Sequence, residues 1–129
     1  MAFRLTLKPR ERAVISGAVI RNGNHRTVLL VENEVPILRE GDILSPREVH
    51  TPSDRVVLAI QLMYLAPEER EKVRETYDEL VADLRAAAPS LARDLEIVNE
   101  HVLAGRYYQA LRAARQLRQD ERRLFNHVR

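Results

Sequence analysis

A nearly unbroken apolar run near the midpoint of the chain, Arg55 to Leu65, most constrains the fold, because the rest of the chain has to cover it. Before this run apolar residues recur mostly at every second position, and after it they recur at every third and fourth. The first period is typical of strands and the second of helices. The expected fold class is α+β: an N-terminal antiparallel β-sheet, as a curled meander or a small barrel or sandwich, followed by a bundle of about three helices.

The expected division of the chain follows the same change of period. Residues 1–66 are expected to be rich in strands and residues 67–129 to be helical, and the two parts are expected to share one core as a single domain. A chain of 129 residues has the size of one ordinary domain. No apolar stretch approaches the roughly 20 residues that span a bilayer, and the first residues alternate instead of forming a signal core. We expect a cytoplasmic protein without membrane contact.

Strands are predicted at the start of the chain. Alternation predicts one over residues 3–7, and β-branched residues predict another over 13–20, within which Gly17 indicates a bulge or a close backbone approach. The pair Asn22-Gly23 then predicts a hairpin turn, because both residues tolerate positive φ.

Two further strands follow the hairpin turn. One covers 27–31 and is expected to be central in the sheet because it is apolar on both faces, and one covers 35–38. The central run over 56–65 contains good helix formers, so a helix stays open, but its length favours a strand that closes the sheet.

Three helices are predicted in the second part. Pro67 suits the first helical position, and Pro89 ends that helix. A second helix begins near Ser90 and ends at Gly105, which suits a helix C-cap. A third runs from about Arg106 toward the end of the chain.

Catalytic and metal-binding patterns are absent from the sequence. There is no cysteine, which excludes disulfides and thiolate ligands, and the histidines at 25, 50, 101 and 127 show no ligand spacing. No glycine-rich phosphate loop and no serine elbow occurs. We therefore expect no cofactor, no metal and no enzymatic activity.

Basic side chains gather in two predicted turns of the sheet. The first turn carries Lys8, Arg10 and Arg12, and the second carries Arg21, His25 and Arg26. Such groups can bind RNA phosphates. Consecutive turns of a meander lie at opposite ends of the strands, so the two would form one patch only if the sheet curled strongly or a second subunit joined them. The acidic turn with Glu32 and Glu34 is expected to lie at the same end of the strands as the first basic turn.

The end of the chain is also basic. Residues 105–129 carry seven basic and two acidic side chains, whereas 67–104 carry five and ten. A helical projection places Arg115, Arg118, Arg122 and Arg129 in one narrow arc beside the apolar stripe, and Tyr108 and Arg112 extend the arc. The arc could bind RNA or an acidic helix, or it could pair with the acidic segment before it.

A glycine, tyrosine and alanine spacing occurs over Leu103–Leu111, as at the start of the second helix of a tetratricopeptide hairpin. Only one such unit is present, which favours close helix packing over a repeat array. Tyr107 and Tyr108 are candidates for protein interaction.

Several segments taken together resemble one family, and they match in order over nearly the whole chain. They are Leu5-Thr-Leu-Lys-Pro-Arg-Glu11, Gly17-Ala-Val-Ile-Arg-Asn-Gly23, Leu38-Arg-Glu-Gly-Asp-Ile43, Thr51-Pro52, Ala59-Ile-Gln-Leu-Met-Tyr-Leu65 and Tyr107-Tyr-Gln-Ala-Leu111. The chain resembles the FlbT family of flagellar biosynthesis repressors. The resemblance implies a post-transcriptional regulator that binds the 5′ untranslated leader of flagellin mRNA and represses its translation or promotes its decay. In some members the effect is activation. The resemblance also implies links to FlaF and to flagellin.

Two classes of function therefore stay open. In the first, the leader RNA lies across arginines of the turns and of the last helix. In the second, the helical part is a protein-binding module for FlaF or flagellin, and any effect on mRNA is indirect; the low aromatic content of 5% fits this class. The sequence leaves the oligomeric state open, a homo-oligomer included.

Overall fold

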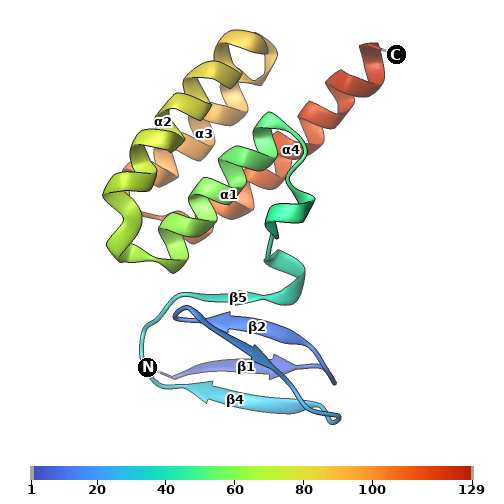
Figure 1. The fold of residues 1–129 in the computed structure, drawn as a ribbon, viewed down its shortest axis with the longest axis vertical. Coiled ribbons are helices and arrows are strands. Elements are labelled where there is room, and N and C mark those ends of the chain that lie inside the picture. The colour runs from blue at the N-terminus through green and yellow to red at the C-terminus, as the bar shows by residue number, and fades with distance from the viewer. Residues whose placement is uncertain (1, 129) are drawn as a thin grey trace. The chain divides into compact units, whose positions relative to one another are not determined.

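The computed structural model describes residues 2–128, with side chains through Asn126. The chain forms two compact units, Met1–Ile43 and Leu44–Arg129. Among the described residues, five strands lie in the first unit and four α-helices in the second (Figure 1), which confirms the α+β class. The expectation that the strand-rich and helical parts share one core stays a prediction.

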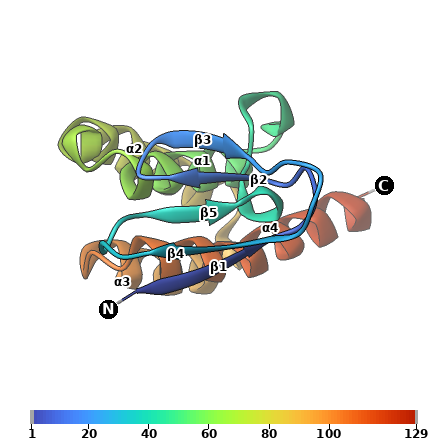
Figure 2. The same ribbon diagram turned by 90° about the horizontal axis from the view of Figure 1, so that it is seen from below.

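The first unit contains two small antiparallel sheets. Its strands are β1 (Phe3–Leu7), β2 (Arg12–Ile15), β3 (Ala18–Arg21), β4 (Thr27–Val31) and β5 (Ile37–Arg39). One sheet pairs β1 with β4, and the other has the order β3-β2-β5 (Figure 2). Alternate residues of these strands form the core of the unit: Leu5, Leu7 and Ala13 are buried, with Ile15, Leu29 and Ile37 against them. The predicted strands 3–7 and 27–31 are thus confirmed. The strand expected over 35–38 is observed as β5, at Ile37–Arg39.

Of the expected forms of the sheet, the meander is not the one found, because the strands form two sheets, β1-β4 and β3-β2-β5, and a reversal at Ser16 and Gly17 divides the strand expected over 13–20. These two residues have φ of 50° and 87°, so both lie in the left-handed region that two-residue hairpin turns use. β2 and β3 pair across this turn, with Ile15 opposite Ala18. Gly17 therefore makes a hairpin turn, where a bulge or close approach was expected.

The hairpin predicted at Asn22-Gly23 does not form, because β3 pairs with β2 while β4 pairs with β1. The residues link the two sheets instead. Strand β4 is consequently an edge strand and not the central strand expected from its apolar residues. Its pairing with β1 places Leu5 opposite Leu29.

The second unit is helical throughout. Its α-helices are α1 (Pro52–Leu65), α2 (Arg70–Ala87), α3 (Ala92–Leu103) and α4 (Tyr107–Val128). Single 3-10 turns flank them at Pro46–Glu48, Pro67–Glu69 and Pro89–Leu91, and another, Glu40–Asp42, follows β5 in the first unit. Helix α1 packs against α2 and α4, and α3 packs along α4.

The strand expected over 56–65 is wrong, since these residues belong to α1. An apolar run without clear period suits a buried helix as well as a buried strand. The deciding signal is local: Thr51 and Asp54 form a capping box around Pro52. The run is apolar on most sides because α1 packs between two other helices, with Val56, Ile60 and others buried.

The helix boundaries expected in the second half are close to those observed. Gly105 has φ of 75° and adopts the left-handed conformation that ends α3. Its N–H donates to the Val102 carbonyl at 3.0 Å, and the Arg106 N–H donates to that of His101 at 2.8 Å. These two hydrogen bonds form a Schellman motif, which ends α3 just before α4 begins.

Candidate nucleic-acid interface

The two basic turns of the first unit lie against each other. The Arg10 N–H donates to the Gly23 carbonyl at 2.8 Å, and the Asn22 N–H donates to the Glu11 carbonyl at 2.8 Å. Four backbone groups of the two turns are therefore paired across the gap between the sheets. These bonds hold residues 8–11 and 22–26 in one surface.

The side chain of Asn22 strengthens this link. Its amide nitrogen donates to the carbonyl oxygens of Lys8 and His25 at 2.8 Å each and to that of Leu7 at 3.3 Å. Its amide oxygen accepts from the Gly23 N–H at 2.9 Å. One half-buried side chain thus satisfies several turn carbonyls that would otherwise need water.

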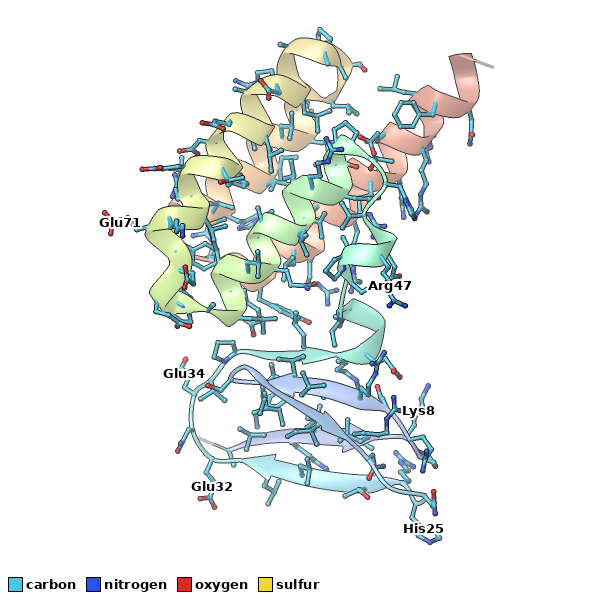
Figure 3. All side chains as sticks on the ribbon, viewed as in Figure 1. Lys8, His25, Glu32, Glu34, Arg47 and Glu71 are labelled. Atoms are coloured by element: carbon cyan, nitrogen blue, oxygen red, sulfur yellow. The ribbon has the colours of Figure 1, made fainter. Side chains whose placement is uncertain are left out.

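The prediction that these turns lie at opposite ends of the strands is wrong. The hairpin at Ser16 and Gly17 adds one reversal between them, so both return to the same end. The acidic turn with Glu32 and Glu34 lies at the other end, as Figure 3 shows with Lys8 and His25 opposite it. The first unit is therefore charged asymmetrically along its strands.

We call the clustered cations the basic end: Lys8, Arg10, Arg12, Arg21, His25 and Arg26. Three of them are tied into the unit. Arg21 donates to the Arg10 carbonyl at 2.8 Å, Arg12 pairs with Glu40 at 2.9 Å, and Arg10 donates weakly to Asn24 at 3.4 Å. Within residues 2–126, the exposed side chains of Lys8, His25 and Arg26 form no hydrogen bond or ion pair.

Glu11 is the acidic group closest to this cluster along the chain. The N–H of Lys8 donates to it at 2.9 Å and Arg39 at 3.2 Å. The bond from the Lys8 N–H is the largest cause that holds the pKa of Glu11 below its usual range; burial opposes it, and the bond and charge of Arg39 and the charge of Lys8 add to the lowering. The carboxylate is thus ionised at neutral pH, and it already accepts hydrogen bonds from the Lys8 N–H and from the charged guanidinium of Arg39.

The arginines of the α4 arc have different surroundings: Arg118 is partly buried in an ion pair, whereas Arg112, Arg115 and Arg122 are exposed. The Arg118 Nε donates to Asp54 Oδ1 of α1 at 2.8 Å, and the Arg118 side chain is 29% exposed. Arg118 therefore does pair with an acid, but with one on α1 instead of one in the acidic segment over 67–104. Arg112 lies 6.0 Å from the Tyr108 ring, Arg115 and Arg122 are exposed, and Arg129 lies outside the described residues.

The two candidate tyrosines are half-buried in the helical unit. The Arg70 guanidinium lies 4.5 Å from the centroid of Tyr107, a cation–π contact. The ring of Tyr108 lies 5.9 Å from that of Tyr64 at an interplanar angle of 48°. These contacts join α4 to α1 and to the start of α2.

Sequence reasoning missed the most buried charge of the helical unit. Glu121 is 3% exposed, and its carboxylate accepts from both the N–H and the hydroxyl of Ser53. A glutamate inside an otherwise apolar stripe of α4 was the available signal. It indicates that a helix N-terminus, here that of α1, lies against that stripe.

Among the side chains that the structure describes, no group of three histidine, aspartate or glutamate residues converges on a possible metal position. In the same part of the chain, no helix combines the length and the hydropathy needed to cross a bilayer.

The architecture defines the class: an α+β protein that joins a β unit with a basic end to a four-helix unit. The chain belongs to the family described as flagellar protein FlbT, whose model matches residues 3–125. The family resemblance seen in the sequence is thereby confirmed.

Several curated relatives carry the family name. A probable flagellum biosynthesis repressor protein FlbT 1 of Bradyrhizobium diazoefficiens is 44% identical over 118 residues, which cover 91% of this chain and 80% of that protein. The corresponding protein of Rhodopseudomonas palustris is 38% identical over 98% of this chain and 99% of its own length. The flagellum biosynthesis repressor protein FlbT of Caulobacter vibrioides is 35% identical over 99% of this chain and 92% of its own length. No solved structure matches the chain.

Proposed function

We propose that this chain is a post-transcriptional regulator of flagellin synthesis that binds the 5′ untranslated leader of flagellin mRNA and represses translation or promotes decay. The observation that carries the proposal is the basic end, where two turns distant in sequence are hydrogen-bonded into one cationic surface. The names of the relatives as flagellum biosynthesis repressors support the biological setting.

The basic end suits an RNA backbone for physical reasons. Arginine forks bind phosphate oxygens in pairs, and the rigid turns hold them at fixed spacing. Binding of this kind releases counterions, so with about four phosphate contacts on a single strand log affinity falls with log salt at a slope near −3. The acidic turn at the other end of the strands repels phosphate and gives the unit a preferred orientation.

The test is a titration of the flagellin leader RNA with purified protein at several salt concentrations. The double variant Lys8→Ala/Arg10→Ala removes two cations of the basic end, and we expect affinity to fall about tenfold or more and the salt slope to become shallower by about one to two. Its matched control is Arg4→Ala/Lys72→Ala, which removes one arginine and one lysine from exposed positions outside the cluster. Equal losses in the two variants, or no loss in either, would contradict the proposal.

A second candidate function is a protein-binding module for flagellin or FlaF. It is favoured by exposed apolar side chains on the helical unit: Leu62, Ile97, Leu103 and Phe125, each between 43% and 65% exposed. Co-purification after nuclease treatment tests it. This candidate is favoured over the first if the complex with flagellin or FlaF survives nuclease treatment and the purified chain does not bind the leader RNA.

A further inference from the structure

Strand β4 has one free edge. Its residues pair with β1, and within the described residues no second strand pairs with it. A free edge presents a row of unpaired backbone N–H and C=O groups that can template another strand. The question is which strand, if any, this edge fits.

The edge lacks the usual protection against pairing. The five residues of β4, Thr-Val-Leu-Leu-Val, contain no charge and no proline. On the outer face of the sheet Val28 is 44% exposed and Leu30 is 66% exposed. A shallow hollow of about 580 Å³ lies beside the end of the strand and is lined in part by Leu30, Val31 and Glu32.

The charges that flank β4 are arranged for pairing with a copy of itself. Arg26 immediately precedes the strand and Glu32 immediately follows it. In an antiparallel pair of two β4 strands centred on Leu29, Arg26 of each copy lies opposite Glu32 of the other. The same register sets Val28 opposite Leu30, so the exposed apolar row of one copy covers that of the other.

Neighbouring registers lose this match. A shift by two positions would set Arg26 opposite Leu30 in one direction, or Glu32 opposite Val28 in the other. A shift by one would turn the outer row of one copy toward the inner row of its partner. The register centred on Leu29 pairs Arg26 with Glu32 and leaves neither charge opposite an apolar residue, whereas the register centred on Leu30 sets Arg26 opposite Glu34 but leaves Glu32 opposite Val28.

We propose that two copies of this chain associate through β4, forming a continuous four-stranded sheet in the order β1-β4-β4-β1. Backbone hydrogen bonds supply the affinity, and the paired Arg26 and Glu32 fix the register. This proposal is independent of RNA binding, because its measurement is the state of association in the absence of RNA.

A charge exchange tests the register. Arg26→Glu alone and Glu32→Arg alone each place like charges opposite one another twice, so the dissociation constant of the dimer is expected to rise about tenfold or more. The double variant Arg26→Glu/Glu32→Arg restores both pairs and the dimer. An equimolar mixture of the two single variants also restores it, as a heterodimer, because glutamates at 26 and 32 then face arginines at 32 and 26.

Sedimentation equilibrium of the full chain measures these states, with circular dichroism showing that each variant is folded. A wild-type protein that is monomeric up to about 100 μM, far above the dissociation constants of specific dimers, overturns the proposal. So does a dimer that both single variants leave unchanged. A mixture of the single variants that stays monomeric overturns the register.

Disulfide trapping gives a second readout, since the natural chain has no cysteine. Val28→Cys and Leu30→Cys chains, when mixed and oxidised, are expected to cross-link to each other in preference to themselves, because these positions are opposite one another only between copies. The control is Leu62→Cys on α1, which is 46% exposed and belongs to the helical unit. Equal cross-linking of the Leu62→Cys chain would mean random collision and would count against the pairing.

Discussion

Ser53, in the first turn of α1, donates its backbone N–H to Glu121 Oε2 at 3.0 Å and its hydroxyl to the other oxygen of the same carboxylate. The two residues are 68 positions apart in the chain. A buried carboxylate of α4 thus satisfies the free N-terminus of α1, where the helix dipole favours negative charge. This contact fixes how the two helices meet.

Glu121→Gln is expected to destabilise the helical unit by about 1 to 2 kcal/mol. The amide oxygen can still accept from the Ser53 N–H and the hydroxyl can turn to accept from the amide nitrogen, but the negative charge at the N-terminus of α1 is lost. The measurement is urea unfolding followed by the helical circular dichroism signal. Glu96→Gln is the matched control, since the Glu96 side chain is 64% exposed and its contact with Arg85 is long at 3.4 Å. A loss in the control as large as in Glu121→Gln would contradict the assigned role.

Arg118→Ala is expected to cost about 1 to 2 kcal/mol at neutral pH by removing the charged donor to Asp54. Burial raises the pKa of Asp54, but the bonds from the His50 N–H and from Arg118 outweigh it and hold that pKa below its ordinary 3.8. The stabilising contribution is therefore complete above pH 3.8 and is lost as pH falls through the lower pKa of the folded state. The gap between wild type and Arg118→Ala should narrow in acid. Unfolding free energies at neutral pH and near pH 3 check this, and a constant gap would contradict it.

Asp94 and Asp120 share a proton across α3 and α4. Burial, and then the hydrogen bond with Asp120, raises the pKa of Asp94 to about 6, whereas the same bond lowers the pKa of Asp120. The stability that Asp94 contributes is complete below its ordinary pKa of 3.8 and is lost as pH rises through about 6.

Asp94→Asn keeps a donor toward Asp120 at every pH. We expect the variant to be more stable than wild type by about 1 kcal/mol at pH 7.5 and to approach it at about pH 5, where Asp94 is protonated. Thermal unfolding at the two pH values measures the difference. Asp83→Asn, on the exposed face of α2, should show no such pH dependence. If it did, the change in net charge alone would explain the effect.

Gly17→Ala is expected to destabilise the β unit by about 1 to 2 kcal/mol, because the residue has φ of 87° and a side chain disfavours that region. Gly41→Ala is the control: its φ is not in the left-handed region and a Cβ there meets no atom within 4 Å. Unfolding of both variants compares the sites. Equal small effects would mean that the turn at Ser16 and Gly17 is not as described.

Much of the fold could be predicted from the chain because its causes are local. Alternation over Phe3–Leu7 marks β1, Pro67 and Pro89 bound the second helix, and Gly105 ends the third. The apolar run over 56–65 was assigned to a strand because burial on most sides removes the period that separates helix from strand. The capping residues Thr51 and Asp54 hold the local information that decides it.

The candidate site depended on long-range pairing. The sequence by itself determined which residues are basic, that Lys8, Arg10 and Arg12 form one group, and that Arg21, His25 and Arg26 form another. Only the tertiary structure decided that the two groups meet, because β1 pairs with β4 and the turn at Ser16 reverses the chain once more. It likewise decided that Arg118 is held by Asp54 and that Glu121 binds Ser53. Partners many residues apart are chosen by packing of the whole unit, and no local pattern records that choice.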